Sequence, residues 1–522
     1  MQMGKRCRHF MAVLGTNLYT DCVYEVEKTE FFCRTAYAQL AVLKYLEWKE
    51  EPADKISILL TQKAYEKNWL TRPYTEKELE ILAGRGMIPK PGEQKTGLEE
   101  ILKAAYPEVT PNPVFIKEGR DQEEIDAIFE KIYEVMEPQE IICFDFTHGL
   151  RNIPMQVLTI IHYAKALKEI QVGGMYYGAY ELGTMTDKEL HVNLLDMTPC
   201  SVILDWTSAA ESFVESGNST QIWKLYETGK RAGRQNQRKA ENAVLKSLYD
   251  LTSCISACRG KTADSSESSI RKAYEEFCRN YQRMMESQES MSAAPLSRLF
   301  DRIREDLRIF QKHPYLLRDG RKVCLDSTAT GLAAVEWAVN KEQTQLGFTA
   351  LEEVIVTLIG EMYELPAEDQ DVREKIIGQP LGYMVHVYGD CKKSQKKSGM
   401  TEEELEKTCR QAGLEKALEQ EEVFREIGRQ AQIEKVKEDA ELFSTYCKAM
   451  KHMTEQISME LLRLLSSIVQ FRNTLNHFGY QKNVMSYKKF RNNLEKWYQE
   501  LLRIMETEGI MQDEDEKLPV SQ

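Results

Sequence analysis

The sequence lacks the cysteine pattern of a zinc site and any apolar run long enough to cross a bilayer. Its 522 residues include twelve cysteines, none of them in a CxxC pair. The closest two, Cys254 and Cys258, have no neighbouring histidine or cysteine to complete a tetrahedral ligand set. No apolar signal region stands at the amino end. We therefore predict a cytoplasmic protein with reduced thiols, no membrane segment and no metal.

The glycine motifs of two large nucleotide-binding families are also missing. Gly15 follows the first predicted strand without the further glycines that a GxGxxG fingerprint needs. Residues 260–262, Gly-Lys-Thr, match the end of a P-loop, but Ile255 occupies the position of its first glycine. These absences exclude a conventional dinucleotide site and a P-loop, so a dehydrogenase is the least favoured function.

Positive charge is in deficit, with 69 lysines and arginines against 82 aspartates and glutamates and a net charge of -13. This charge balance argues against an extended nucleic-acid-binding surface, but it is compatible with a local basic groove that binds nucleic acid. Three basic stretches qualify, at residues 230–239, 392–397 and 482–491. We interpret the first as a linker and the second as an exposed loop.

Short apolar runs alternate with amphipathic segments over residues 1–204. Runs without polar alternation predict strands covered on both faces, and this order is typical of an α/β domain with a mostly parallel sheet. The predicted strands are residues 11–15, 56–60, 114–117, 141–144, 172–177 and 192–195, and the predicted helices are residues 31–48, 123–135 and 153–167. Residues 71–97 are expected to form an irregular excursion in which Arg85, Lys90 and Lys95 are solvated.

Two turns at the ends of these strands carry residues suited to a ligand. They are Gly15, Thr16 and Asn17 after the first strand, and Thr147, His148, Gly149, Arg151 and Asn152 after the fourth. Backbone amides at a helix start, a glycine and a guanidinium suit an anionic ligand, although an ordinary capped turn has a similar composition. Ligands of parallel sheets bind where strand order reverses, so we expect both turns to line one crevice.

Beyond residue 204 the strand-like runs give way to long helical periodicities. We predict one domain at residues 1–204, a connecting helix and basic linker at residues 205–240, and a helical domain at residues 241–522. The expected helices are residues 205–226, 241–258, 269–287, 296–311, 330–340, 350–365, 401–447, 453–478 and 487–506.

The late helix contains a second group of polar residues. Arg472 shares a helical stripe with the apolar residues Leu461, Leu465, Ile468 and Leu475. Arg472, Asn473 and His477 form an RxxxxH pattern, RNTLNH, in which Asn473 and His477 share a face. A charge on an apolar stripe requires a partner or a function, so a buried ion-pair network and a catalytic site both remain open. We interpret the other RxxxxH match, at residues 308–313, as chance.

The order of these parts resembles a known family. LGTN at residues 14–17 and DFTHGLRNIP at residues 145–154, followed by a helical domain with RNTLNH, is similar to the CRISPR-associated CARF–HEPN ribonucleases of type III systems. DWTSAAESF at residues 205–213 also resembles the family, whereas residues 240–430 match no motif of it.

The resemblance implies a Rossmann-like CARF sensor domain followed by an all-α HEPN ribonuclease domain. The eight residues of the two turns would bind cyclic oligoadenylate, four-membered by analogy, across a homodimer. Arg472, Asn473 and His477 of both subunits would cleave single-stranded RNA without metal or cofactor. With His477 as acid or base and Arg472 on the phosphate, attack by the 2′-hydroxyl would leave 2′,3′-cyclic phosphate ends.

Two other hypotheses stay open. One is a cyclic-nucleotide sensor without catalytic activity, whose helical domain binds a partner or DNA. The other is a toxin-type HEPN ribonuclease that needs no ligand and carries an unrelated first domain.

Overall fold

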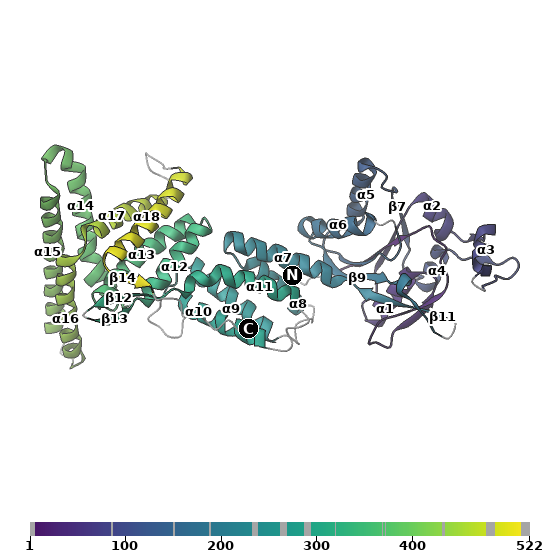
Figure 1. Cartoon of the computed structure of the whole chain (residues 1–522), viewed down its shortest axis with the longest axis horizontal. Coiled ribbons are helices and arrows are strands. Elements are labelled where there is room, and N and C mark those ends of the chain that lie inside the picture. Colours follow the sequence, from purple (N-terminus) through teal and green to yellow (C-terminus); the bar gives the residue numbers. More distant parts are fainter. Residues whose placement is uncertain are drawn as a thin grey trace. The chain divides into compact units, whose positions relative to one another are not determined.

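The computed structural model divides the chain into two compact units, Met1–Asp205 and Trp206–Gln522, and each is described by itself. The residues that the structure describes are 6–84, 87–149, 152–186, 189–231, 239–260, 269–286, 294–318, 320–367, 369–370, 372–430, 434–476 and 486–512. The second unit consists mostly of helices, whereas the first unit is built around a β-sheet (Figure 1).

Nine strands of the described residues form the sheet of the first unit. Its strands are β1 Arg8–Leu14, β2 Cys22–Glu25, β3 Phe32–Thr35, β4 Lys55–Leu60, β7 Asn112–Phe115, β8 Ile141–Asp145, β9 Gln171–Gly178, β10 Thr184–Thr186 and β11 Glu189–Asp196. The order β7-β4-β1-β8-β9 is parallel throughout, and β11, antiparallel to β9, continues it toward β2 and β3. The predicted α/β fold with a mostly parallel sheet is confirmed.

Both faces of this sheet are covered, which explains why its strands lack polar alternation. Along β1, Phe10 packs into the core on one face and Met11 into the core on the other. The first core includes side chains of α1 (Ala38–Trp48) and α4 (Leu98–Ala105). The second includes side chains of α5 (Gln122–Val135) and α6 (Asn152–Lys168). Helices on both faces therefore fix β1 and β8 at the centre of the unit.

Two predictions for the first unit are wrong. The helix expected over residues 31–48 begins only at Ala38, because Phe32–Thr35 forms the strand β3, antiparallel to β2. The excursion at residues 71–97 is also more regular than expected. Its ends pair as β5 (Arg72–Pro73) and β6 (Gln94–Lys95) around α3 (Glu76–Gly84). Lys95 is buried rather than solvated, whereas Lys90 is exposed as expected and Arg85 lies outside the described residues.

Long helices and one small sheet make up the second unit. Its helices are α7 Thr198–Ser216, which begins in the first unit, α8 Thr220–Arg231, α9 Lys239–Ser256, α10 Ile270–Glu286, α11 Ala294–Asp306, α12 Asp326–Asn340, α13 Thr344–Met362, α14 Gln379–Ser398, α15 Glu402–Gln430, α16 Glu434–Gln456, α17 Met459–Asn476 and α18 Tyr487–Thr507. Three short strands, β12 Pro314–Arg318, β13 Arg321–Cys324 and β14 Ile510–Gln512, form an antiparallel sheet that the sequence did not predict.

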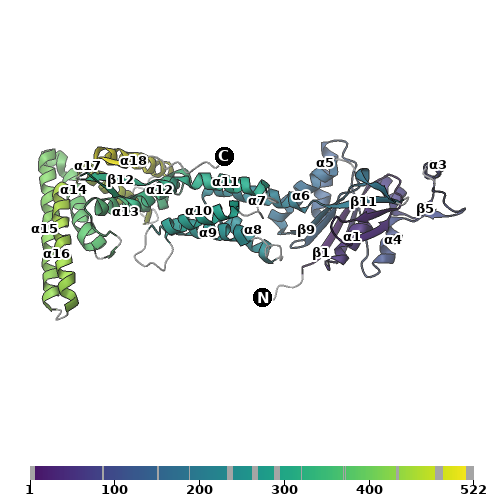
Figure 2. The same ribbon diagram turned by 60° about the horizontal axis from the view of Figure 1, so that its bottom comes forward.

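Three of the differences between the predicted and the observed helices change the course of the chain in this unit. The connecting helix at residues 205–226 is interrupted at Gly217, whose φ of 72° suits glycine and ends α7. Residues 392–397, expected as a loop, lie inside α14. The helix expected over residues 401–447 is two helices, α15 and α16, which run side by side in both views (Figures 1 and 2).

None of the helices, as far as the chain is described, has the length and apolar character needed to cross a membrane.

Candidate functional site

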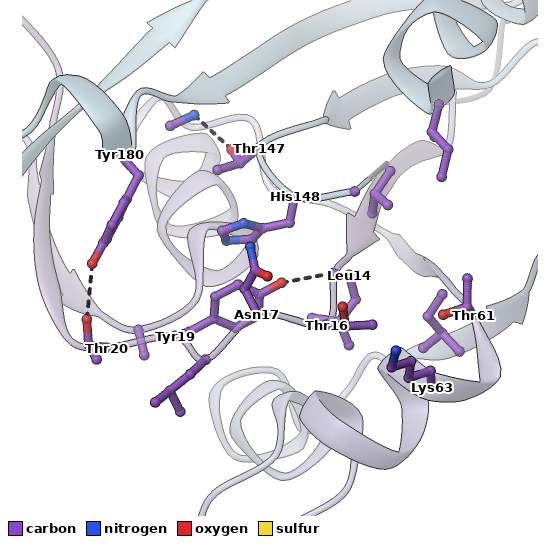
Figure 3. A pocket seen from close by; sticks show the side chains of 18 of the residues that line it. Leu14, Thr16, Asn17, Tyr19, Thr20, Thr61, Lys63, Thr147, His148 and Tyr180 are labelled. Carbon is purple, nitrogen blue, oxygen red and sulfur yellow. Dashed lines mark hydrogen bonds between the residues drawn. The ribbon is translucent and has the colours of Figure 1, made fainter. Parts of the chain in front are cut away.

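The carboxyl ends of the parallel strands surround a cavity of about 690 Å³ in the first unit. Among the five parallel strands that include β1, the chain moves from β1 outward to β4 and β7 on one side, and then returns to β8 and β9 on the other. The strand order therefore reverses between β1 and β8, which is where parallel sheets bind ligands. The cavity is lined by residues that include Gly15, Thr16, Asn17, Thr61, Lys63, Ile81, Glu118, Thr147, His148, Gly149, Tyr180 and Glu181 (Figure 3).

Hydrogen bonds on both sides hold the loop after β1. The Gly15 amide donates to the Tyr19 hydroxyl at 2.9 Å. The carbonyl oxygens of Gly15 and Asn17 accept from the side-chain amide of Asn68 at 2.7 and 2.9 Å. Asn68 itself is fully buried, in the π-helix Tyr65–Trp69 that follows β4. The loop thus has a fixed backbone shape, with Thr16 and Asn17 on the cavity wall.

Buried hydrogen bonds also fix the loop after β8. Asp145, the last residue of β8, is fully buried and accepts from the amide and the hydroxyl of Thr147. The Thr147 hydroxyl accepts in turn from the Gly178 amide at 2.7 Å, which ties this loop to β9. Burial raises the pKa of Asp145 to about 6, although the hydrogen bonds from Thr147 oppose the shift. Its second carboxylate oxygen is buried without a partner among the described residues.

Gly149 is required by the geometry of the same loop. Its φ is 143°, and a Cβ at this position would lie 2.7 Å from Cγ1 of Val13 on β1. Only glycine accommodates both the backbone conformation and this close approach. The loop after β8 therefore lies directly against β1.

The imidazole ring of His148 forms part of the cavity wall and carries no positive charge. Its ring lies against Tyr19, with centroids 4.2 Å apart, and both rings face the cavity (Figure 3). Burial lowers the pKa of His148 to about 4, so the imidazole is neutral at physiological pH. The cation among the described residues of the wall is Lys63, which is exposed.

The structure does not add the remaining two residues of the predicted set to this wall. Arg151 lies outside the described residues. Asn152 is the first residue of α6, and its side-chain amide lies beside Gly119 and not on the cavity wall. The structure thus brings together six of the eight residues, three from each turn.

Sequence reasoning missed several wall residues. Thr61 and Lys63 follow β4, Glu118 follows β7 and Tyr180 follows β9, so each comes just after a strand of the parallel set. Their position relative to the strand ends was a usable signal. Asn68 carried no such signal, because its two loop contacts are 53 and 51 residues away in sequence.

The second candidate site lies on α17. Leu461, Leu465 and Ile468 are buried, as a core stripe requires. Arg472, farther along the same stripe, donates to Oε1 of Glu352 on α13 at 3.0 Å.

This ion pair is partly buried and incompletely satisfied. Nε of Arg472 and Oε2 of Glu352 are buried without a partner among the described residues. Burial raises the pKa of Glu352, although the Arg472 charge opposes the shift. Asn473 is exposed, and His477 lies outside the described residues. Arg472 has the structural partner that its place requires, and a catalytic role for RNTLNH stays a prediction.

The described residues contain no group of three or more histidine, cysteine, aspartate or glutamate side chains placed to hold a metal ion.

Comparison with known proteins gives a partial match. No protein-family model matches the chain. The chain is 30% identical over 141 residues to the CRISPR-associated protein MJ1674 of Methanocaldococcus jannaschii. The matched part is 25% of this chain and spans 22% of the length of that relative. The chain is thus similar, over part of its length, to a CRISPR-associated protein.

Proposed function

We propose that this protein is a CRISPR-associated CARF–HEPN ribonuclease that cyclic oligoadenylate activates. One observation carries the proposal: the turns after β1 and β8, far apart in sequence, line one cavity at the point where strand order reverses. A helical unit with the RNTLNH pattern and the partial similarity to a CRISPR-associated protein support the same class.

The cavity has features that suit a nucleotide ring. Its volume of about 690 Å³ is typical of sites for organic ligands. The glycine-containing loops allow a close approach to the backbone, and Thr16, Asn17 and Thr61 offer polar groups. Lys63 supplies a cation for a phosphate, whereas neutral His148 and Tyr19 supply flat surfaces of the kind on which bases stack. In a homodimer, two such cavities would bind one symmetric ring.

The chemistry proposed for the second unit needs a phosphate clamp and a proton carrier. Arg472 would bind the phosphate, His477 would transfer a proton, and Asn473 would orient one of them. Because Arg472 pairs with Glu352 in this structure, the phosphate has to compete with that carboxylate. Binding of the ring would change the relative positions of the two subunits and bring their catalytic sets together.

The test is cleavage of a fluorogenic single-stranded RNA in EDTA, with no activator, with cyclic tetra-adenylate or with cyclic hexa-adenylate. Wild type is compared with His477→Ala and with a matched control, His386→Ala, whose side chain is 73% exposed on α14. We expect cleavage only with one of the rings, lost in His477→Ala and kept in His386→Ala. Equal cleavage by both variants would refute the catalytic assignment.

Wild type that binds a ring without cleaving RNA would instead favour the non-catalytic sensor. Cleavage that no ring changes would favour the ligand-independent ribonuclease.

A further inference from the structure

The excursion at residues 71–97 contributes to the cavity wall. Ile81 of α3 lines the cavity, although α3 lies outside the α/β alternation. Leu82 is the buried residue of α3, and Ile81 is 38% exposed. The excursion thus adds an apolar side chain to the cavity wall.

A buried polar network at the base of the excursion explains how it is held. Lys95, at the end of β6, donates to the side-chain oxygen of Asn68 and to the carbonyl oxygen of Lys67. Its ammonium lies 3.5 Å from Oε1 of Glu78 on α3. Glu78 in turn accepts from Arg72 at 2.8 and 2.7 Å. The network therefore joins both strands of the excursion to α3.

The same network ends at the loop after β1. Asn68 accepts from Lys95 through its side-chain oxygen, and donates to the carbonyl oxygens of Gly15 and Asn17 through its side-chain nitrogen. Asn68 has 0% of its surface exposed and Lys95 has 5%. Burial lowers the pKa of Lys95 to about 8, so it disfavours the charged form of the side chain. A lysine that only solvates a loop would have no reason to be buried at this cost. One buried amide thus connects the excursion with the loop.

We infer that Asn68 and Lys95 are positioning residues of the cavity, and that the excursion is part of the binding site. Asn68 holds residues 15–17 in the shape that receives the ligand, and Lys95 locks Asn68 to the element that carries Ile81. This inference rests on the proposed function, because it names the residues that preorganise the cyclic oligoadenylate site. A loop fixed before binding loses less conformational freedom on binding, so the affinity depends on this pair.

Three variants of the network separate positioning from stability. Asn68→Asp keeps the size and the acceptor for Lys95, but it removes both donors to the loop and places a carboxylate against two carbonyl oxygens. Lys95→Met removes the ammonium, and Lys95→Arg keeps a buried cation with donors. Ser57→Ala is the matched control, because Ser57 lies toward the amino end of β4 and loses only a buried hydrogen bond to His9.

Two measurements on the full chain decide the inference. The first is hydrogen exchange of the amides of residues 15–19 without any ligand. The second is the dissociation constant for cyclic tetra-adenylate and cyclic hexa-adenylate. We expect faster exchange in Asn68→Asp and Lys95→Met than in Ser57→Ala. We also expect affinity to fall by about tenfold or more in these two variants and to be largely kept in Lys95→Arg.

Unchanged exchange of residues 15–19 in Asn68→Asp would overturn the inference, whatever the ring affinity of wild type. Affinities of Asn68→Asp and Lys95→Met equal to that of Ser57→Ala would also overturn it. If wild type binds neither ring, the proposed function fails. Faster loop exchange in the variants would then still support the role of Asn68 and Lys95 in holding the loop.

Discussion

The stability of the first unit depends on pH through Asp145, and the substitution Asp145→Asn should remove this dependence. The carboxyl group is fully buried, and burial raises its pKa from 3.8 to about 6. One oxygen accepts from Thr147 and the other has no partner among the described residues. The folded state therefore holds the Asp145 proton at pH values where the unfolded chain has released it.

The sign and size of the effect follow from this difference in pKa. A group whose pKa is raised on folding stabilises the protein fully below its unfolded pKa, and this stabilisation is lost as pH rises through the folded pKa. For Asp145 the loss between about pH 4 and pH 7 is on the order of 3 kcal/mol of unfolding free energy. The amide that Asp145→Asn introduces does not titrate, and its side-chain oxygen still accepts from Thr147.

Urea unfolding of wild type and Asp145→Asn between about pH 4 and pH 7 measures this effect. Labelling of the Cys143 thiol, quantified by peptide mass spectrometry, reports the first unit alone, because Cys143 is buried in β8. Relative to wild type, the variant should gain about 3 kcal/mol over this pH range. Parallel stabilities of the two proteins across the range would refute the reasoning.

Two further substitutions test the geometry around the cavity. Gly149→Ala should lower the stability of the first unit by about 1–3 kcal/mol, because a Cβ at φ 143° would collide with Val13. The control is Gly382→Ala, which should not lower the stability because no heavy atom lies within 4 Å of the added Cβ. Thermal unfolding of both variants and of wild type measures the difference. Glu78→Gln should cost on the order of 3 kcal/mol at neutral pH, because hydrogen bonds from Arg72 lower the pKa of Glu78 to about 2. This stabilisation is present above the ordinary pKa of the carboxyl group and is lost as pH falls through about 2, so a difference that persists unchanged in acid would contradict the assignment.

The parts of the fold that follow from local pattern were predictable from the sequence. β1 and β8 are apolar on both faces, and the alternation around them predicts a parallel sheet. The general rule for such sheets then places the turns that contain Gly15 and Thr147 at one crevice, where the structure has the cavity.

Features that depend on distant partners were not predictable. Phe32–Thr35 pairs with β2, although its apolar spacing also fits the start of α1. Lys95 reads as a loop lysine, and its burial depends on Asn68 and Glu78, which lie 27 and 17 positions earlier in the chain. Likewise Arg472 finds Glu352 across 120 positions. The tertiary fold determines which strands pair and which side chains form ion pairs. The hydrophobic periodicity of a short sequence segment therefore carries no information on these partners.

The central claim is that the cavity binds cyclic oligoadenylate, and isothermal titration of the full chain with cyclic tetra-adenylate and cyclic hexa-adenylate tests it most directly. The variant is Lys63→Ala, on the cavity wall, and its matched control is Lys131→Ala, on the surface of α5. We predict saturable binding of one ring, about tenfold weaker in Lys63→Ala because a charge-assisted contact to phosphate is lost, and unchanged in Lys131→Ala. Failure of wild type to bind either ring, or equal affinity of wild type and Lys63→Ala, would contradict the account.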